Sequence, residues 1–157
     1  MSCKQAGCAG LMLLAAVGSG CGDDPAPPPR HEVTINGRTW RVELAITPEE
    51  RYRGLGGRAS LAEDAGMLFV FPWTETQEFC MRDCLIPLDI AFIGADLRVV
   101  KTHTMAVEPN AYSYTGYRSV ESAQYALEVP AGALARAAVK VGDRVEFSEN
   151  IPLSAKE

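Results

Sequence analysis

Apolar and polar residues alternate over residues 31–46, on either side of the pair Asn36-Gly37. A period of two is typical of β-strands, because successive side chains point to opposite faces of a sheet. Asn-Gly between two such runs favours a tight hairpin, since both central residues of a type I′ turn need a positive φ. The segment therefore predicts a β-hairpin, with Trp40 and Val42 on the core-facing side of its second strand.

The pattern changes after this hairpin. Thr47 can cap a helix, Pro48 suits its first position, and Glu50 completes a capping box, so we expect a short helix that Gly54 ends. A second short helix is predicted within residues 130–140, which are rich in small apolar residues.

Further strands are predicted from short apolar or alternating runs bounded by turn residues. They are residues 67–71, 77–81, 125–129 and 144–147. Residues 88–94 and 97–105 are expected to pair as a second hairpin, and residues 107–119 are expected to form a long loop. Seven or eight strands with two helical inserts predict a mainly β domain, either a sandwich or a distorted barrel. The expected core is Val42, Leu44, Ile46, Leu68, Phe69, Phe71, Ile90, Phe92, Val99, Leu127, Val139, Val141 and Val145.

The N-terminal region has a different composition. Residues 1–21 hold one charge, Lys4, and a short apolar run before Cys21, which is typical of a signal peptide and too short for a membrane span. Cys21 stands where a bacterial lipoprotein would be cleaved and acylated. Gly18, three positions earlier, replaces the branched apolar residue that is usual there. The alternative is that the signal peptide is cleaved and no lipid is attached. Residues 22–30 hold four prolines and predict an extended tether. A single domain over residues 31–150 follows.

These features predict an exported protein of the bacterial cell envelope, held on the membrane by an N-terminal lipid and facing the periplasm or the outside. The chain carries a formal net charge of −5. A nucleic-acid-binding protein is expected to present a basic face, so this charge argues against such partners. A small molecule or another envelope protein is the expected partner, and no cofactor is expected.

Three blocks of sequence carry a family resemblance: ERYRGL with Arg58 in the predicted helix region, GMLF at residues 66–69, and residues 79–89, FCMRDCLIPLD. They resemble the signature of the domain-of-unknown-function 192 family, which has no settled biochemical role. The resemblance implies a jelly-roll-like β-sandwich over roughly residues 33–147. The chain departs from the family pattern at several positions, among them Cys80, Asp83 and Cys84.

The two cysteines of the third block are candidates for a disulfide, because an exported domain with two cysteines usually pairs them. Four residues along a strand span about 13 Å, whereas a disulfide needs Cα atoms about 4.4–6.8 Å apart. A bond between Cys80 and Cys84 therefore requires a turn between them. Free buried thiols and a redox or metal role are the alternatives.

Copper is the metal that these residues would favour. Cys80 and Cys84 supply soft sulfur ligands, and His103 and Met105 would lie on one face of a strand, so that together they could bind Cu(I). The alternative is that His103 is an ordinary strand residue and that no metal binds.

Acid–base chemistry is a third hypothesis. Asp83, Asp89, Glu128 and Arg58 could converge into a hydrolase site, with Arg82 holding an anion. Asp89 could equally bond backbone amides at a turn. Whether the chain is an enzyme is left open by the sequence, which leans toward no catalysis.

A non-catalytic binding or accessory module is the hypothesis that we favour. Asn110, Tyr112, Tyr114 and Tyr117 predict an aromatic loop, and such loops on rigid β-scaffolds bind ligands or partners; alternatively the loop packs back over the core. The expected ligand-binding residues are Arg58, Arg82, Asp83, Asp89 and Tyr117.

Overall fold

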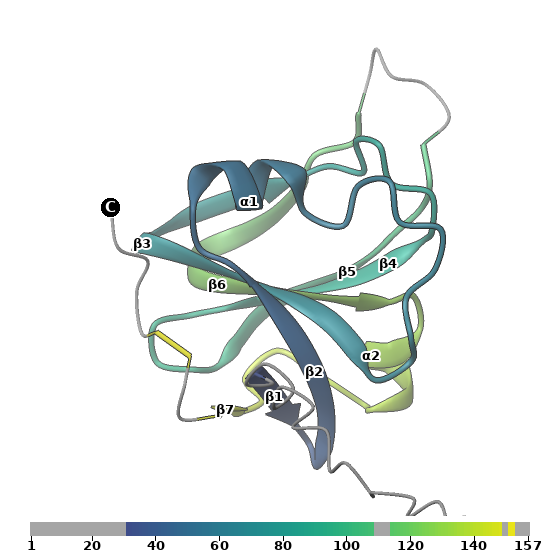
Figure 1. Ribbon diagram of the computed structural model, residues 1–157. Helices are drawn as coiled ribbons and strands as arrows, with labels where there is room; N and C mark the ends of the chain where they lie inside the picture. Colours follow the sequence, from purple (N-terminus) through teal and green to yellow (C-terminus); the bar gives the residue numbers. More distant parts are fainter. Residues whose placement is uncertain (1–30, 109–113, 149–150, 153–157) are drawn as a thin grey trace, which may run out of the picture.

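Seven strands of one sheet and two short helices make up the described part of the chain, residues 31–108, 114–148 and 151–152 (Figure 1). This computed structural model orders them β1 (His31–Ile35), β2 (Arg38–Ala45), α1 (Pro48–Arg53), β3 (Ala65–Phe79), β4 (Leu88–Ile93), β5 (Val99–Met105), β6 (Tyr117–Pro130), α2 (Ala133–Arg136) and β7 (Val145–Phe147). The predicted signal peptide, Cys21, the tether, Asn110 and Tyr112 lie outside the described residues. In the described residues no helix is long and apolar enough to cross a bilayer.

The first hairpin is confirmed. β1 and β2 pair in antiparallel fashion with Ile35 opposite Arg38, and Asn36 and Gly37 between them have φ of 52° and 76°. Both central residues therefore take the positive φ that the type I′ turn requires. The second predicted hairpin is confirmed as β4 and β5.

Strand β3 differs from the prediction. Residues 67–71 and 77–81 were expected as two strands divided by Pro72, but one strand of 15 residues runs through the proline. Its pairing with β6 is irregular between Val70 and Glu75, and a proline is tolerated where the ladder needs no N–H donor. β6 likewise begins at Tyr117, inside the predicted loop, because it pairs with this extended part of β3.

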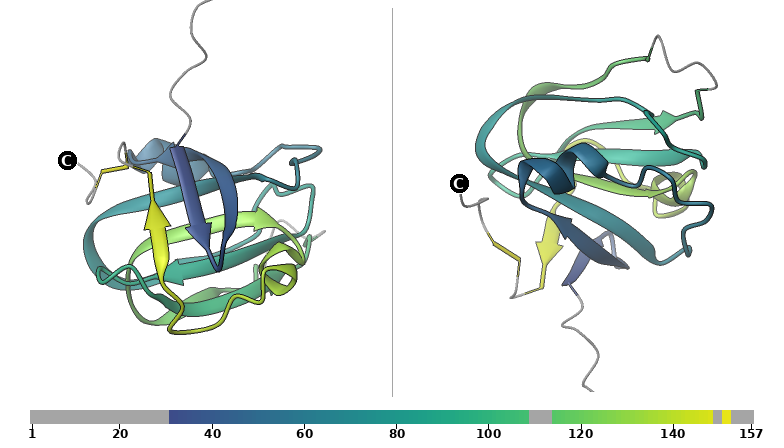
Figure 2. Two further views of the ribbon diagram at one scale, coloured as in Figure 1. Left: turned by 90° about the horizontal axis from the view of Figure 1, so that it is seen from below. Right: turned by 45° about the horizontal axis from the view of Figure 1, so that its top comes forward.

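The sheet runs in the order β5-β4-β6-β3-β2-β1-β7 and curls until its two outer strands approach each other (Figure 2). A backbone bridge joins Arg98 to Arg144, and the amide of Val145 donates to the carbonyl of Leu97 at 2.8 Å. The prediction of a mainly β fold with two helical inserts is confirmed, and the curled sheet corresponds to the distorted barrel rather than to two stacked sheets. β2 and β3 are parallel neighbours, and α1 lies in the connection between them.

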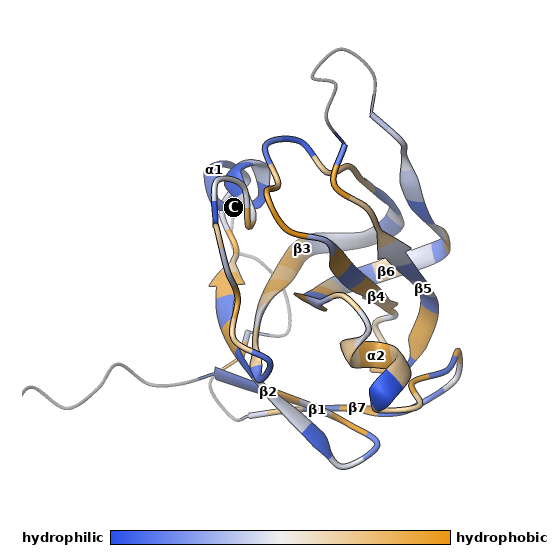
Figure 3. Cartoon of the chain, turned by 90° about the vertical axis from the view of Figure 1, so that its right-hand side faces the viewer, coloured by the Kyte–Doolittle hydropathy of each residue, from blue (hydrophilic) through white to orange (hydrophobic). Residues whose placement is uncertain are grey.

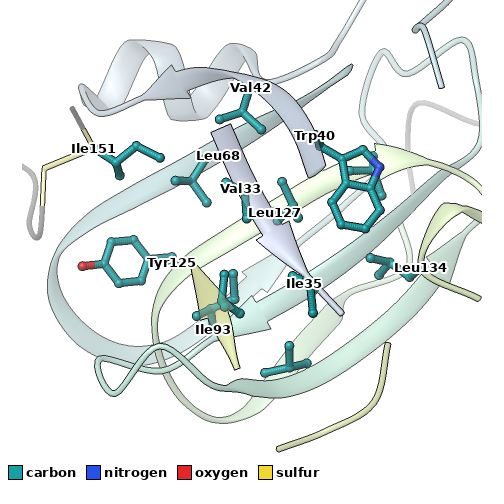
Figure 4. Close-up of a cluster of buried hydrophobic side chains, with 14 of the residues drawn as sticks. Val33, Ile35, Trp40, Val42, Leu68, Ile93, Tyr125, Leu127, Leu134 and Ile151 are labelled. Carbon is teal, nitrogen blue, oxygen red and sulfur yellow. The ribbon is translucent and has the colours of Figure 1, made fainter. Parts of the chain in front are cut away.

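Two clusters of buried apolar side chains lie on the two faces of the sheet. The first is inside the curl and includes Val33, Trp40, Leu68 and Leu127 (Figure 4). The second lies on the outer face, beneath α1 and the segments that follow it, and includes Leu55, Met67, Phe69, Met81, Ile90 and Phe92. The predicted core is confirmed for most of its members, but Val141 is 61% exposed and that assignment was wrong.

The short helix α1 is fixed by its ends rather than by its packing. Thr47 Oγ1 accepts a bond from the Glu50 amide at 3.2 Å, and the Glu50 carboxylate accepts one from the Thr47 amide at 2.9 Å, which is the predicted capping box. None of its residues is buried, and its surface is largely hydrophilic (Figure 3). Arg51 donates to the carbonyls of Ile46 and Val70, which ties the helix to β3.

Candidate functional site

A cavity of about 360 Å³ lies under α1, against the outer face of β3 and β6. Its volume falls within the range of small-molecule sites in proteins. The turn that follows β3 forms one of its walls. We term it the site cavity, and its apolar lining consists of Leu55, Phe69, Phe71 and Phe79.

Glu128 is the buried carboxyl of this cavity. In β6 it alternates with Leu127 and Val129, which face the interior of the curl, so that its side chain shares the outer face with Ala126. The residue is 4% exposed, and its carboxyl makes no hydrogen bond or ion pair to another described residue. Burial raises the pKa of Glu128 to about 8, so the group holds its proton at neutral pH.

Gln77 brings a second unsatisfied polar group to the same cavity. It lies in β3 two residues before Phe79 and is 8% exposed, and its Nε2 is buried without a hydrogen-bond partner. Its backbone amide donates to Ser119 Oγ at 3.1 Å, which fixes the strand here but leaves the side-chain amide free. Two buried polar groups from neighbouring strands therefore face one cavity without partners, an arrangement that costs stability unless a ligand or water satisfies it.

The turn after β3 places both cysteines at the cavity. The Cys84 amide donates to the carbonyl of Met81 at 3.2 Å, and Asp83 has a φ of 57°. Cys80 and Cys84 flank this turn as half-buried free thiols. Burial, with a smaller effect of the nearby Glu128 carboxyl, raises the pKa of Cys84 to about 11, so its thiolate is scarce at neutral pH. The turn that a disulfide requires is present, and the disulfide itself stays a prediction.

Arg82 closes the mouth of the cavity against α1. Its guanidinium carbon lies 3.8 Å from the centre of the Tyr52 ring, and the group donates to the Tyr52 carbonyl at 3.0 Å. Beyond it lies a wider groove of about 750 Å³ that includes Glu49 and Asp83. We consider the site cavity the better candidate, because the groove is lined by exposed or half-buried residues, whereas the cavity holds buried polar groups.

The other expected ligand-binding residues are only partly brought together. Arg58 is held by Glu43 through two bonds of 2.6 Å, and the amide of its neighbour Gly57 donates to the carbonyl of Asp83 at 2.8 Å, so this segment borders the groove. Asp89 lies on the opposite face of the sheet, in phase with Ala91. There its carboxylate accepts bonds from the Leu134 amide at 3.0 Å and the Thr104 hydroxyl at 2.7 Å.

Asp89 therefore holds α2 against the sheet and faces away from Glu128. The expected acid–base group is divided between two faces, with Asp83 on the exposed rim.

Two of the expected copper ligands, His103 and Met105, lie on β5. The ring of His103 packs edge-on against Phe92 at 6.1 Å and Tyr117 at 5.7 Å, and its Nε2 donates to the carbonyl of Arg118 at 2.8 Å. Met105 is fully buried in the outer-face cluster, against which Cys84 packs. Within the described ranges, no three His, Cys, Asp or Glu side chains gather closely enough to hold a metal ion. Copper binding stays a prediction.

Gln77 was not predicted as a site residue, and Glu128 was included only in the hydrolase hypothesis. A signal for Glu128 was present, since it is the one charged residue in the apolar strand of residues 125–129. For Gln77 no such signal exists, because a glutamine among polar neighbours is ordinary in an exposed strand.

The described residues form a small mainly β domain with a pocket of about 360 Å³ on the outer face of its sheet. The sequence profile of the domain-of-unknown-function family DUF192, described as "Uncharacterized ACR", matches residues 31–147. The chain belongs to this family, as its sequence blocks indicated. No curated protein matches the chain.

The solved structures that are similar to the protein include two bacterial ones. A proposed transcription regulator from Sinorhizobium meliloti 1021 has 35% sequence identity and a TM-score of 0.67, over 75% of this chain and 92% of that chain. A protein of unknown function from Novosphingobium aromaticivorans DSM 12444 has 34% identity and a TM-score of 0.67, over 74% of this chain and 83% of that chain.

Proposed function

We propose that the protein is a non-catalytic binding module that takes a small molecule in the site cavity. The observation that carries the proposal is the pair Glu128 and Gln77, two buried side chains without partners that face one cavity of about 360 Å³. Most buried polar side chains in proteins have a hydrogen-bond partner, so two without one in the same cavity favour a ligand site. Three phenylalanine rings supply the apolar surface that small-molecule sites commonly have.

The test is a fragment screen on the full chain, by thermal shift and ligand-observed NMR, for the wild type and Gln77→Met. The substitution removes an unsatisfied buried amide and should raise the free energy of unfolding by about 1 kcal/mol. The same change should weaken the binding of fragments that contact the cavity. A gain in stability with a loss of binding is the signature of a residue kept for a ligand.

Thr76→Met is the matched control, since it introduces the same side chain one position earlier at an exposed site. It should leave binding unchanged. A screen without any fragment whose binding depends on Gln77 would contradict the proposal.

We further propose that the domain works in the bacterial cell envelope, anchored by a lipid on Cys21. The support is the sequence of residues 1–30, a signal-like segment followed by a proline-rich tether. Cys21→Ser should move the protein from the membrane fraction to the soluble fraction of cells. An unchanged distribution would contradict lipid anchoring.

A thiol-redox role is the second candidate function, favoured by the turn that brings Cys80 and Cys84 to one cavity. Counting free thiols in the protein as isolated, before and after reduction, tests it. If both cysteines are free thiols before reduction and mild oxidants do not oxidise them, a thiol-redox role is excluded.

A further inference from the structure

Three arginine side chains lie at the mouth of the site cavity. Arg51, Arg53 and Arg82 line the cavity, and none of them forms an ion pair with another described residue. Glu78 also lines it, but its carboxylate is held by Arg118 at 2.7 Å. A guanidinium group without an ion-pair partner can bind a carboxylate, so these arginines favour an anionic partner at this place.

The interior of the cavity offers hydrogen-bond donors. Gln77 Nε2 has two N–H groups and no acceptor among the described residues. Because the pKa of Glu128 is about 8, its carboxyl is mostly neutral at pH 7 and has an O–H to donate. The thiol of Cys84, with a pKa of about 11, is neutral as well and adds a weak donor.

We propose that the site cavity binds an organic anion, a carboxylate or a comparable acceptor group on an apolar body, to which Gln77 and the neutral form of Glu128 donate hydrogen bonds. The arginines at the mouth attract the charge of the ligand, and Phe69, Phe71 and Phe79 contact its apolar body. This inference rests on the proposed function and deepens it by naming the class of ligand.

An organic cation fits the same surfaces less well. It would approach past three guanidinium groups, and the cationic group of Arg51 already lies 5.5 Å from the centre of the Phe71 ring, where a ligand cation would bind. The carboxylates near the entrance, Glu49 and Asp83, line the outer groove rather than the cavity.

Three probes of one shape and different charge test the inference: 3-phenylpropionate, 3-phenylpropylamine and 3-phenylpropanol, titrated into the full chain by calorimetry at pH 7 and pH 9. We expect the carboxylate to bind most tightly. Its affinity should be about tenfold lower at pH 9, because the neutral fraction of a group of pKa about 8 falls about tenfold over that interval. An amine that paired with ionised Glu128 would show the opposite dependence.

Substitutions of Glu128 and of the arginines show how much each residue contributes to binding of the carboxylate. Glu128→Gln keeps an N–H donor and cannot ionise, so binding of the carboxylate at pH 7 should persist and its pH dependence should vanish. Arg53→Gln and Arg82→Gln should each weaken binding about two- to fivefold, as partly exposed ion pairs do. Arg144→Gln is the matched control, an exposed arginine that does not line the cavity, and should change nothing.

The inference is overturned if the amine or the alcohol binds as tightly as the carboxylate, or if the carboxylate does not bind. The proposed function survives that result when the fragment screen still gives binding that depends on Gln77. It fails together with the inference when the screen is empty as well.

Discussion

Replacing Glu128 with glutamine should change how the stability of the protein depends on pH. The carboxyl is 4% exposed, and its pKa is raised by burial from an ordinary value near 4.5 to about 8. In the unfolded chain the same group regains its ordinary pKa. Between these two values the folded protein binds one proton more than the unfolded chain, so stability falls as the pH rises.

The magnitude follows from the shift. Each pKa unit corresponds to about 1.4 kcal/mol, so a shift from 4.5 to about 8 makes a contribution of about 5 kcal/mol. This contribution is fully present below pH 4.5 and is lost as the pH rises through 8. Between pH 5 and pH 8.5 the wild type should therefore lose about 4 kcal/mol relative to Glu128→Gln, which has no proton to lose.

Urea unfolding at pH 5, 6.5 and 8.5 provides the assay, followed by the fluorescence of the fully buried Trp40. With a urea slope of about 2 kcal/mol/M, the midpoints of wild type and variant should move apart by about 2 M over this range. Glu75→Gln removes an exposed carboxylate from the same sheet and is the control, which should follow the wild type. Midpoints of Glu128→Gln that stay parallel to those of the wild type would refute the reasoning.

Two further predictions concern the packing around the site. Asp89→Ala should lower the free energy of unfolding by about 2–4 kcal/mol, because the Leu134 amide and the Thr104 hydroxyl lose their acceptor. Urea unfolding measures this change, and a loss of stability below about 1 kcal/mol would contradict the prediction. Gly66→Ala should lower the free energy of unfolding by about 1–3 kcal/mol, because the added Cβ would lie 2.5 Å from the carbonyl oxygen of Glu128. An unchanged midpoint of thermal unfolding would contradict this prediction and show that the strands have room to separate.

Local sequence signals predicted the elements whose geometry depends on adjacent residues. Asn36-Gly37 determines its turn through positive φ, and Thr47 with Glu50 determines the start of α1 through bonds within one helical turn. Pro72 misled the prediction, since a proline indicates a strand end only where its partner strand requires an N–H donor. The parallel pairing of β2 with β3 and the bridge that closes the curl join distant segments, which local patterns do not encode.

The site could be predicted only in part, because the sequence does not tell which face of a buried strand meets open space. Asp89 and Glu128 look alike in the sequence, each a single carboxyl within an apolar run. In the structure the carboxylate of Asp89 lies beside the first residues of α2 and accepts a hydrogen bond from the Leu134 amide. The carboxyl of Glu128 faces the site cavity and has no such partner among the described residues. The difference arises from where the two helices dock, and that is set by the whole sheet.

Helix α1, which covers the site cavity, affects how fast the cavity opens. α1 contains no buried side chain and is held against the domain by the bonds of Arg51 to backbone carbonyls and by the contacts of Arg82 with Tyr52. We therefore expect it to open locally while the sheet stays intact. Its amide protons should therefore exchange with solvent through a local opening, long before those of β3 and β6. We expect this opening to widen the mouth of the cavity, so that ligand exchange should be faster than global unfolding.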